Sequence, residues 1–584
     1  MVATSVPAEP VPAEPVPAED GAGPARRWIH VTTLADLLGQ RALQHPDRDA
    51  LVFPAERASY RDVAARAHDF ARRLTGLGVR RGDRVGLLLP PSVDLVALLF
   101  AAAKIGAIPV PVNARFKRHE LAHVIAHSGM KILVTAPADP AAPDFLALLA
   151  ETFEDLPRQP GAELSLKEAP ELRRVVVLGP APAGAPFVSS APFKAAGDAV
   201  TDATIAAAEQ SVRVRDTAVI VYTSGTTASP KGAMLSHEAL VRLADGIAGR
   251  LLLTPDDRVW TAIPLFHGGG ITFALTCITA GCTFVHAGLF NPAATPAYLE
   301  DERVTVALAA FETIWLPVLA QPDFATRDLS RIRVVMVVGV PERLREMAAR
   351  LPGAIQVSCV AMTESSAFLS LSRLDDPFEK RVTTGGHSMP GMECRVVDPA
   401  TGRDLPAGQR GELLFRGPNA FDGYFRDPGL TGHAFDAEGW FHSGDLVTMD
   451  ADGRLTFISR LKDMMKVGGE NVAAAEVEGF LLTHPAVAIV AVVAAPDDYY
   501  VEVPAAFVQL KPGARVTEQE LTEYCLGKIA TYRVPRYVRF IIEWPMSGTK
   551  IKKHVLRDVI REELRRKGIT EAPRLRAANR GAAG

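Results

Sequence analysis

The sequence predicts an α/β fold made of two unequal parts. From Trp28 to about Leu461, short apolar stretches alternate with helix-like stretches, as in a layered α/β protein. One example is a strand predicted at 85–89, followed by a helix at 92–105. After Asp463 the pattern changes to that of a smaller unit. The chain has 584 residues, 48% of them hydrophobic, which is enough for several packed cores.

Two stretches depart from this alternation. The first twenty residues repeat Val-Pro-Ala-Glu-Pro three times with little variation, so residues 1–26 are predicted to be a disordered leader. This leader lacks the basic start and apolar core of a signal peptide. Residues 137–212 are rich in Ala, Pro and Gly and are predicted to form a surface elaboration, with one strand-like island at 174–178.

The smaller C-terminal unit has its own series of predicted elements. A helix is expected at 474–482, strands at 487–493 and 505–510, and a basic helix near the end. The apolar run at 486–495 is the longest, and it is too short for the ~20 residues that span a bilayer. We therefore expect no transmembrane segment.

Charge and cysteine content exclude several classes of protein. The chain has 64 basic and 67 acidic side chains, a net charge of −3, which favours neither nucleic acid nor an anionic membrane. Its five cysteines include no CxxC pair, which argues against a disulfide framework and a structural zinc site. We expect reduced thiols and a cytoplasmic location.

A hydroxyl-rich loop is the first candidate site. A strand predicted at 217–221 leads into YTSGTTASPKG at 222–232, and Ser236 is placed to cap a helix at 239–250. The loop offers backbone N–H groups, several hydroxyls and Lys231, all suited to phosphate oxygens. A polar turn is the alternative, since these residues dominate loops. The loop is not a GxxxxGK[ST] P-loop, because Lys231 follows Pro230.

The loop resembles the signature of the adenylate-forming superfamily of acyl-CoA synthetases, adenylation domains and luciferases. Further motifs follow in the family's order: PLFHGGG at 264–270, MTE at 362–364, GEL at 411–413, GWFHSGDL at 439–446 and SRLKDMMKVGGENV at 459–472. The resemblance covers about residues 30–570. The HGGG string also resembles an esterase oxyanion loop, but the chain has no GxSxG nucleophile elbow.

The resemblance implies an architecture and an activity. It implies a multi-subdomain AMP-binding body at 27–460 with a β-barrel-like subdomain, a hinge at 461–463, a small mobile α+β lid at 464–570 and a basic tail at 571–584. It also implies that a carboxylic acid reacts with ATP to give acyl-AMP, which then passes its acyl group to a thiol. Mg²⁺ and CoA complete the expected set of ligands.

The resemblance assigns roles to individual residues. Glu364 would hold Mg²⁺, and Lys462 would be the hinge. Gly468 and Gly469 would let the CoA arm pass. Lys550 and His267 would be the catalytic residues, with His267 as the gate of the acyl pocket. The expected nucleotide-binding residues are Thr223, Ser224, Gly225, Thr226, Thr227, Lys231, Val338, Gly339, Val360, Ala361, Met362, Thr363, Asp445 and Arg460. Ordinary turns, solvated charges and a packing histidine are the alternatives.

Four features depart from the family pattern, and all concern ATP. Counting back from Leu556 makes Lys550 the catalytic lysine, with Lys552 and Lys553 as competitors and Thr549 in place of a glycine. The other departures are Ala228 for a glycine, Val360 and Ala361 for an aromatic-glycine pair, and Val338 in a normally glycine-rich stretch. They remove the ring that stacks on adenine and add methyl groups where backbone approaches nucleotide.

These departures motivate a second hypothesis beside the acid–CoA ligase. The protein would perform only the thioester-forming half-reaction, on acyl-AMP supplied by a partner adenylating enzyme. A carrier-protein loader, a luciferase-like oxygenase and a non-catalytic nucleotide-binding protein are further alternatives. Three apolar stretches are expected to line the acid pocket: the one after His267, 311–316 and 338–340. Such a pocket suits a hydrophobic acid. Phe311 and Trp315 are equally well explained as core residues.

Overall fold

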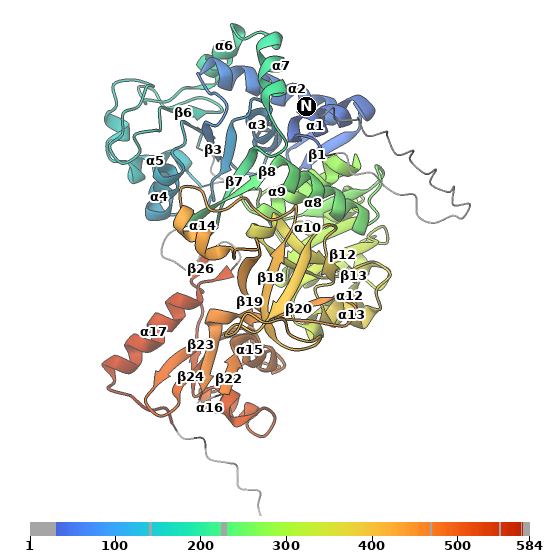
Figure 1. The fold of residues 1–584 in the computed structure, drawn as a ribbon, viewed down its shortest axis with the longest axis vertical. Coiled ribbons are helices and arrows are strands. Elements are labelled where there is room, and N and C mark those ends of the chain that lie inside the picture. The colour runs from blue at the N-terminus through green and yellow to red at the C-terminus, as the bar shows by residue number, and fades with distance from the viewer. Residues whose placement is uncertain are drawn as a thin grey trace, which may run out of the picture. The chain divides into compact units, whose positions relative to one another are not determined.

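The computed structural model describes residues 31–138, 143–223, 230–467, 470–547, 550–573 and 575. Its first large element is a seven-stranded sheet in the order β13-β12-β11-β9-β10-β1-β2 (Figure 1). The strands are β13 (Ile355–Val357), β12 (Val334–Val338), β11 (Val306–Phe311), β9 (Arg258–Thr261), β10 (Thr283–His286), β1 (Asp49–Phe53) and β2 (Glu56–Ser59). All neighbours run parallel except β1 and β2. The strands are rich in Val, Ala and Phe because most of their residues are buried.

A second parallel sheet has the order β4-β3-β5-β6. Its strands are β4 (Ile108–Pro111), β3 (Arg84–Leu88), β5 (Ile132–Thr135) and β6 (Arg174–Val177). The Ser92 hydroxyl accepts a hydrogen bond from Leu95 N (3.3 Å) and caps α3 (Val93–Lys104), which confirms the strand and helix predicted here.

The stretch 137–212 is not the surface elaboration that its composition suggested. Its strand β6 is an edge of the second sheet, and α6 (Ser190–Asp198) buries Phe193 against Phe70, 6.1 Å between ring centroids. Ile205 of α7 (Asp202–Ser211) is also fully buried. The high content of Ala, Pro and Gly drew attention away from a few large apolar side chains, which are buried and fix the segment to the rest of the fold.

The hydroxyl-rich loop, which the resemblance assigns to phosphate binding and which we call the phosphate loop, connects the two strands of a hairpin. Strand β7 (Thr217–Thr223) pairs antiparallel with β8 (Lys231–Ser236), so that Thr223 lies opposite Lys231. Helix α8 (His237–Arg250) begins after β8, and the Ser236 hydroxyl accepts from Ala239 N at 3.2 Å. The predicted cap is confirmed, and β8, a strand that the sequence did not predict, lies between the loop and the helix.

Two antiparallel sheets carry the later motifs. The first contains β14 (Cys359–Met362), β15 (Ala367–Leu371) and β16 (His387–Ser388). The second, in the part expected to be barrel-like, has the order β17 (Glu393–Val397), β18 (Gly411–Arg416), β19 (Phe441–Met449) and β20 (Leu455–Arg460). In its core the ring of Phe441 lies 5.0 Å from that of Phe415 and 5.3 Å from that of Phe421, measured between centroids.

The last sheet has separate hydrophobic clusters. It contains β22 (Glu470–Ala473), β21 (Met464–Val467), β24 (Val501–Leu510), β23 (Val487–Asp497) and β25 (Tyr537–Phe540). Helices α15 (Ala474–Leu482), α16 (Glu518–Cys525) and α17 (Lys553–Arg566) accompany it. The helix predicted at 474–482 and both predicted strands are confirmed. The expected hinge falls in the 3-10 helix η4 (Leu461–Asp463), and its role stays a prediction.

The remaining helices complete the α/β architecture. They are α1 (Leu34–Gln44), α2 (Tyr60–Gly76), α4 (Arg118–Ser128), α5 (Phe145–Thr152), α9 (Gly268–Ala280), α10 (Thr295–Asp301), α11 (Glu312–Leu319), α12 (Pro341–Arg350), α13 (Phe378–Thr383) and α14 (Pro428–Ala434). Among the described residues, no helix is both long enough and apolar enough to cross a membrane. All five cysteines are free thiols, and four of them are buried.

Candidate active site

Several predicted residues lie where the strands of the seven-stranded sheet end. In an α/β sheet, ligands bind outside the carboxyl ends of the parallel strands. Strand β11 ends at Phe311, β12 ends at Val338, and β9 leads after Thr261 to the segment that carries His267. The sheet therefore brings together motifs that are far apart in the sequence.

His267 begins helix α9. Its Nδ1 accepts a hydrogen bond from Gly269 N (3.1 Å), and its half-buried ring meets Phe311 edge-on, with 6.4 Å between centroids. A Cβ on Gly270 would lie 2.4 Å from Pro264 O, so this helix start requires glycine. Trp315, in contrast, is fully buried and packs on Trp260 at 6.0 Å, which makes it a core residue.

The Val338–Gly339 stretch is shaped by a carboxylate that the sequence did not reveal. Glu312 accepts a hydrogen bond from Val340 N (3.0 Å) and pairs with Arg343 (3.0 Å). A Cβ on Gly339 would lie 2.0 Å from Glu312 Oε1, so any larger residue here would displace the Glu312 side chain. The side chain of Val338 is 37% exposed at the strand end. Glu312 carries no local signal, because a glutamate at a helix start is common.

The turn that carries Thr363 and Glu364 is strained. After the 3-10 helix η3 (Thr363–Ser365), Ser366 has φ +60° and Ala367 has φ +116°, values that non-glycine residues rarely adopt. Thr272 Oγ1 donates to Ser366 O (3.0 Å), and Ser366 Oγ donates to Asn419 O (2.8 Å). Such strain persists only where surrounding contacts enforce it, and it concentrates at functional sites.

Tyr424 connects Glu364 with the phosphate hairpin. Its hydroxyl donates to Glu364 Oε1 at 2.8 Å, and the Lys231 Nζ lies 5.5 Å from the centroid of its ring. Burial raises the pKa of Tyr424 above its usual value, and the charge of Glu364 raises it further. Sequence reasoning missed Tyr424, although it lies shortly after the GEL motif.

Asp445 and Arg460 lie opposite each other on β19 and β20. Arg460 Nε approaches Asp445 Oδ1 to 2.8 Å, and Asp445 N donates to Ser443 Oγ (3.0 Å). The Asp445 side chain is buried, while that of Arg460 is partly exposed. Arg460 also lowers the pKa of Tyr424, so its charge acts on the same region as Glu364.

Val360 and Ala361 differ in their surroundings. A bulge separates them in β14, Val360 is buried, and Ala361 is exposed. The Val360 side chain packs so closely that a Cβ on Gly385 would lie 2.6 Å from its Cγ2. Met362 is buried beside them. Only the methyl group of Ala361 is thus exposed at the position of this pair.

Some predicted residues lie outside the described part of the chain: Ser224, Gly225, Thr226, Thr227, Ala228, Gly468, Gly469 and Thr549. For Lys462 and Lys550 the structure gives only the backbone, in η4 and in the two-residue strand β27 (Lys550–Ile551). The two competitors of Lys550 are ion-paired. Lys552 lies 3.6 Å from Glu120, and Lys553 lies 2.7 Å from Glu478.

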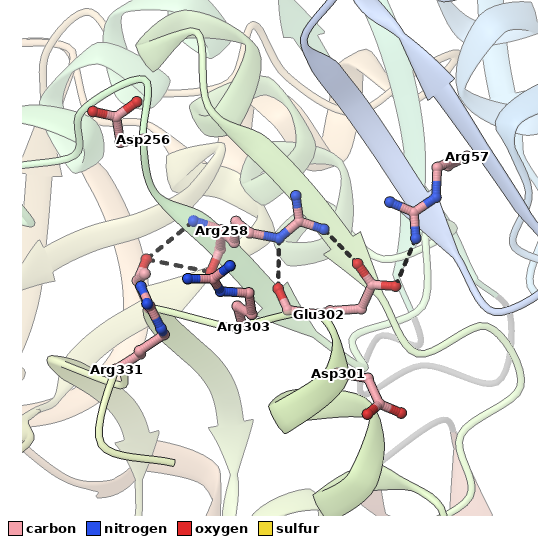
Figure 2. A pocket seen from close by; sticks show the side chains of 8 residues that line it. Arg57, Asp256, Arg258, Asp301, Glu302, Arg303 and Arg331 are labelled. Carbon is pink, nitrogen blue, oxygen red and sulfur yellow. Dashed lines mark hydrogen bonds and ion pairs between the residues drawn. The ribbon is translucent and has the colours of Figure 1, made fainter. Parts of the chain in front are cut away.

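A different charged pocket lies mainly at the amino ends of the same sheet, where β9 and β11 begin (Figure 2). Its volume is about 420 Å³, and it is lined by Arg57, Asp256, Arg258, Asp301, Glu302, Arg303, Thr305 and Arg331. Glu302 points between Arg57, at 2.9 Å, and Arg258, and its backbone carbonyl accepts from Arg258 Nε (2.5 Å). These pairs tie β2, β9 and the end of α10 together.

A magnesium ion fits the candidate site through a single protein carboxylate. Within the described ranges, no group of three or more His, Cys, Asp or Glu side chains is arranged to hold a metal. Glu364 is half-buried and accepts one neutral hydrogen bond, at Oε1. Mg²⁺ usually takes one or two carboxylates and fills its other positions with water and phosphate oxygens, so the single carboxylate suffices.

Comparisons with known proteins identify the family of the chain. Residues 38–425 match the family described as AMP-binding enzyme, and residues 476–550 match the AMP-binding enzyme C-terminal domain. The chain is 34% identical over 540 residues to the putative acyl-CoA synthetase YngI of Bacillus subtilis, covering 91% of this chain and 97% of that protein. It is 32% identical to the mitochondrial medium-chain acyl-CoA ligase ACSF2 of Bos taurus, covering 92% and 89%.

Solved structures share the fold. MatB from Rhodopseudomonas palustris with bound ATP has a TM-score of 0.77 and 27% identity, and the match covers 91% of this chain and 100% of that one. The anthranilate CoA ligase AuaEII in complex with anthranoyl-AMP has a TM-score of 0.78 and 26% identity, covering 92% and 98%. Since the family match spans more than half of the chain, the protein belongs to the AMP-binding enzymes of the adenylate-forming superfamily.

Proposed function

We propose that this protein is an AMP-forming acid–CoA ligase, which converts a hydrophobic carboxylic acid to its CoA thioester through an acyl-adenylate. The arrangement of Glu364, Tyr424 and Lys231 beside the Asp445–Arg460 pair is the observation that carries the proposal. Two of its relatives are named as an acyl-CoA synthetase and an acyl-CoA ligase.

The first chemical step brings two anions together. A carboxylate oxygen attacks the α-phosphorus of ATP, and the bond to pyrophosphate breaks. Fixed cations and donors must offset the charge that gathers there, and the loss of one such donor typically costs about 2.7–4 kcal/mol. Lys231 and Thr223 would serve the outer phosphates, Thr363 the α-phosphate, and Lys550 the reacting oxygens. Asp445 and Arg460 would hold the ribose.

Glu364 would hold Mg²⁺ through its carboxylate. The ion supplies charge neutralisation on the phosphate oxygens when it is bound. The strained turn after Glu364 supports this role, because the protein spends stability to hold the carboxylate in one place.

The second step forms the thioester. The CoA sulfur attacks the acyl carbonyl carbon and AMP leaves. In this proposal Gly468 and Gly469 let the pantetheine arm pass, and the segment 464–570 rotates about Lys462 between the two steps. His267 would gate the acyl pocket, since its ring lies against Phe311 at the end of β11. Phe311 and the exposed side chain of Val338 favour an apolar acyl group.

A second candidate is an enzyme restricted to the thioester-forming half-reaction. The observation that favours it is the buried Val360 and exposed Ala361 where the family has an aromatic ring for adenine. Without this ring, the adenine of ATP and that of acyl-AMP would each lose a stacking contact worth about 0.5–1.5 kcal/mol, a loss that weakens adenylation without abolishing it. A partner enzyme would then supply the acyl-AMP.

Two parallel assays test these proposals. One supplies medium-chain and aromatic acids with ATP, Mg²⁺ and CoA, and measures both pyrophosphate and acyl-CoA. The other supplies synthetic acyl-AMP and CoA. Turnover in both assays supports the complete ligase, whereas turnover only with acyl-AMP supports the half-reaction. If neither assay gives acyl-CoA with any acid, the ligase proposal is wrong.

A further inference from the structure

We infer that Tyr424 is a positioning residue for the ATP half-reaction: its hydroxyl orients the Glu364 carboxylate for Mg²⁺, and its ring holds Lys231 toward the phosphates. The inference rests on the proposed function and assigns it one further residue.

The two contacts of Tyr424 use different parts of the side chain. The hydroxyl donates to Glu364 Oε1 at 2.8 Å, while Lys231 Nζ lies 5.5 Å from the ring centroid. A cation near an aromatic face is attracted by the negative charge density of the ring. One residue thus contacts both the carboxylate proposed for the metal and the cation proposed for the phosphates.

The backbone around Tyr424 is attached to both partners. Phe421 N donates to Glu364 O (2.9 Å), and Phe425 N donates to Gly232 O (2.7 Å), directly after Lys231. Tyr424 N donates to Thr431 Oγ1 (2.9 Å). Residues 421–425 therefore hold the turn of Glu364 and the end of the phosphate loop in a fixed relation, and the Tyr424 side chain extends between them.

The burial of Tyr424 suits a positioning role. The residue is 9% exposed, and its hydroxyl donates to the Glu364 carboxylate at 2.8 Å. By donating to Oε1 it fixes the carboxylate plane, and Oε2 accepts no hydrogen bond from the described residues. Outer partners of this kind typically change metal affinity 10–100-fold when removed.

Two substitutions separate the hydroxyl from the ring. Tyr424→Phe removes the hydrogen bond to Glu364 and keeps the ring under Lys231. Tyr424→Leu removes both. Tyr60→Phe is the matched control, because Tyr60 is also buried and its hydroxyl donates to Cys282 O at 2.7 Å, outside the candidate site.

The main measurement does not depend on turnover. Free Mn²⁺ is followed by electron paramagnetic resonance as it is titrated into enzyme with a non-hydrolysable ATP analogue. We expect Tyr424→Phe to weaken Mn²⁺ binding about tenfold and to raise the Mg²⁺ concentration needed for half-maximal adenylation by a similar factor. The rate of thioester formation from supplied acyl-AMP should change less than twofold. Tyr424→Leu should weaken binding of the ATP analogue further, and Tyr60→Phe should leave every ligand measurement unchanged.

Each result decides between the possibilities. Equal Mn²⁺ affinity in the wild type and Tyr424→Phe would overturn the inference while leaving the ligase proposal intact. Equal loss of both half-reactions in Tyr424→Phe would also overturn it, because Tyr424 would then be a structural residue. A wild-type protein that binds no ATP analogue and forms no acyl-CoA would overturn the proposed function as well.

Discussion

The charged pocket around Glu302 and the candidate site around Glu364 differ in the partners that they give to a carboxylate. At the amino edge, Glu302 is enclosed by two guanidinium groups, those of Arg57 and Arg258. At the carboxyl edge, Glu364 receives one neutral hydrogen bond from Tyr424 on a strained turn. A carboxylate neutralised by arginines stabilises the fold and has little left to offer a ligand. The Glu364 carboxylate pairs with no arginine or lysine in the described part of the chain, and its Oε2 accepts no hydrogen bond there.

The largest expected effect concerns Lys550, the catalytic lysine of this proposal. Lys550→Ala should reduce acyl-AMP formation about 10²–10³-fold, the usual result of removing one donor to a charged transition state. Thioester formation from supplied acyl-AMP should persist if Lys550 serves adenylation alone, as the proposal assigns it. Pyrophosphate release and acyl-CoA formation measure the two steps separately. Lys553→Ala is the control, since Lys553 is paired with Glu478. Equal collapse of both steps in Lys550→Ala would contradict its assignment.

Substitution of Glu302 should lower stability, whereas substitution of Glu364 should lower activity. Glu302→Gln should lower the free energy of unfolding by about 1.5 kcal/mol, because Arg57 and Arg258 lose one shared carboxylate and keep only Asp49. The specific activity of the folded protein should not change. Glu364→Gln should have the reverse profile, with stability altered by less than about 1 kcal/mol and adenylation strongly reduced. Urea unfolding and pyrophosphate release measure the two quantities.

The contrast between the clusters fails if Glu302→Gln is as stable as the wild type or if Glu364→Gln unfolds as readily as Glu302→Gln. Asp301→Asn serves as a neutral control in the same pocket, because Asp301 makes no ion pair in the described structure. Its free energy of unfolding should stay within about 0.5 kcal/mol of the wild type.

A buried histidine at the carboxyl edge makes the free energy of unfolding depend on pH. His286 Nε2 donates to Ile263 O (3.0 Å), its Nδ1 accepts from Gly288 N (3.0 Å), and burial lowers its pKa to about 4. The unfolded chain binds a proton near pH 6.5 and the folded chain does so only near 4, so stability falls as the pH drops through this window. Between pH 7 and 5 this histidine should account for about 2 kcal/mol.

Substitution isolates this contribution from that of His237, whose pKa burial also lowers to about 4. His286→Gln keeps a donor for Ile263 O and removes the titrating group. Its stability should therefore fall less between pH 7 and 5 than that of the wild type. Chemical unfolding at a series of pH values measures the slope, and identical slopes would contradict the prediction.

Much of the site was predictable because its signals are local. The loop at 222–232, the motif at 362–364 and the pair Asp445 and Arg460 are short strings that can be read directly in the sequence. The structure pairs Arg460 Nε with Asp445 Oδ1 at 2.8 Å, and the roles of these residues stay predictions. Tyr424 and Glu312 were not predictable. Their roles come from contacts across 60 and 28 positions of sequence, and neither residue type is unusual where it occurs.

The errors in the fold have a related cause. The strand β8 was missed because its residues KGAMLS show no clear alternation, and its partner β7 and the segment at 421–425 supply its hydrogen bonds. Residues 137–212 were misread from average composition, whereas single side chains such as Phe193 and Ile205 anchor the segment. Local propensity is a weak guide where tertiary pairing decides the structure.

The smallest expected effect tests backbone strain at the amino edge. Arg303 follows the C-cap of α10 with φ +50°, and the hydrogen bonds from Arg303 N to Glu300 O and from Val304 N to Leu299 O form a helix end that usually contains glycine. Arg303→Gly removes a strain of about 1–2 kcal/mol and adds about 0.5–1 kcal/mol of chain entropy to the unfolded state.

The net result should be a gain of about 0.5–1 kcal/mol in the free energy of unfolding, measured in urea, with both half-reactions unchanged. Arg303→Ala is the matched control, because it removes the same side chain and keeps the strain, so its stability should equal that of the wild type. If both variants lose stability equally, the charge of the Arg303 guanidinium stabilises the pocket by more than the backbone strain costs. A gain in the glycine variant alone would show that the strain at the amino edge lies in the backbone of residue 303. The ion pairs of Glu302, which hold this edge together, would then be independent of that strain.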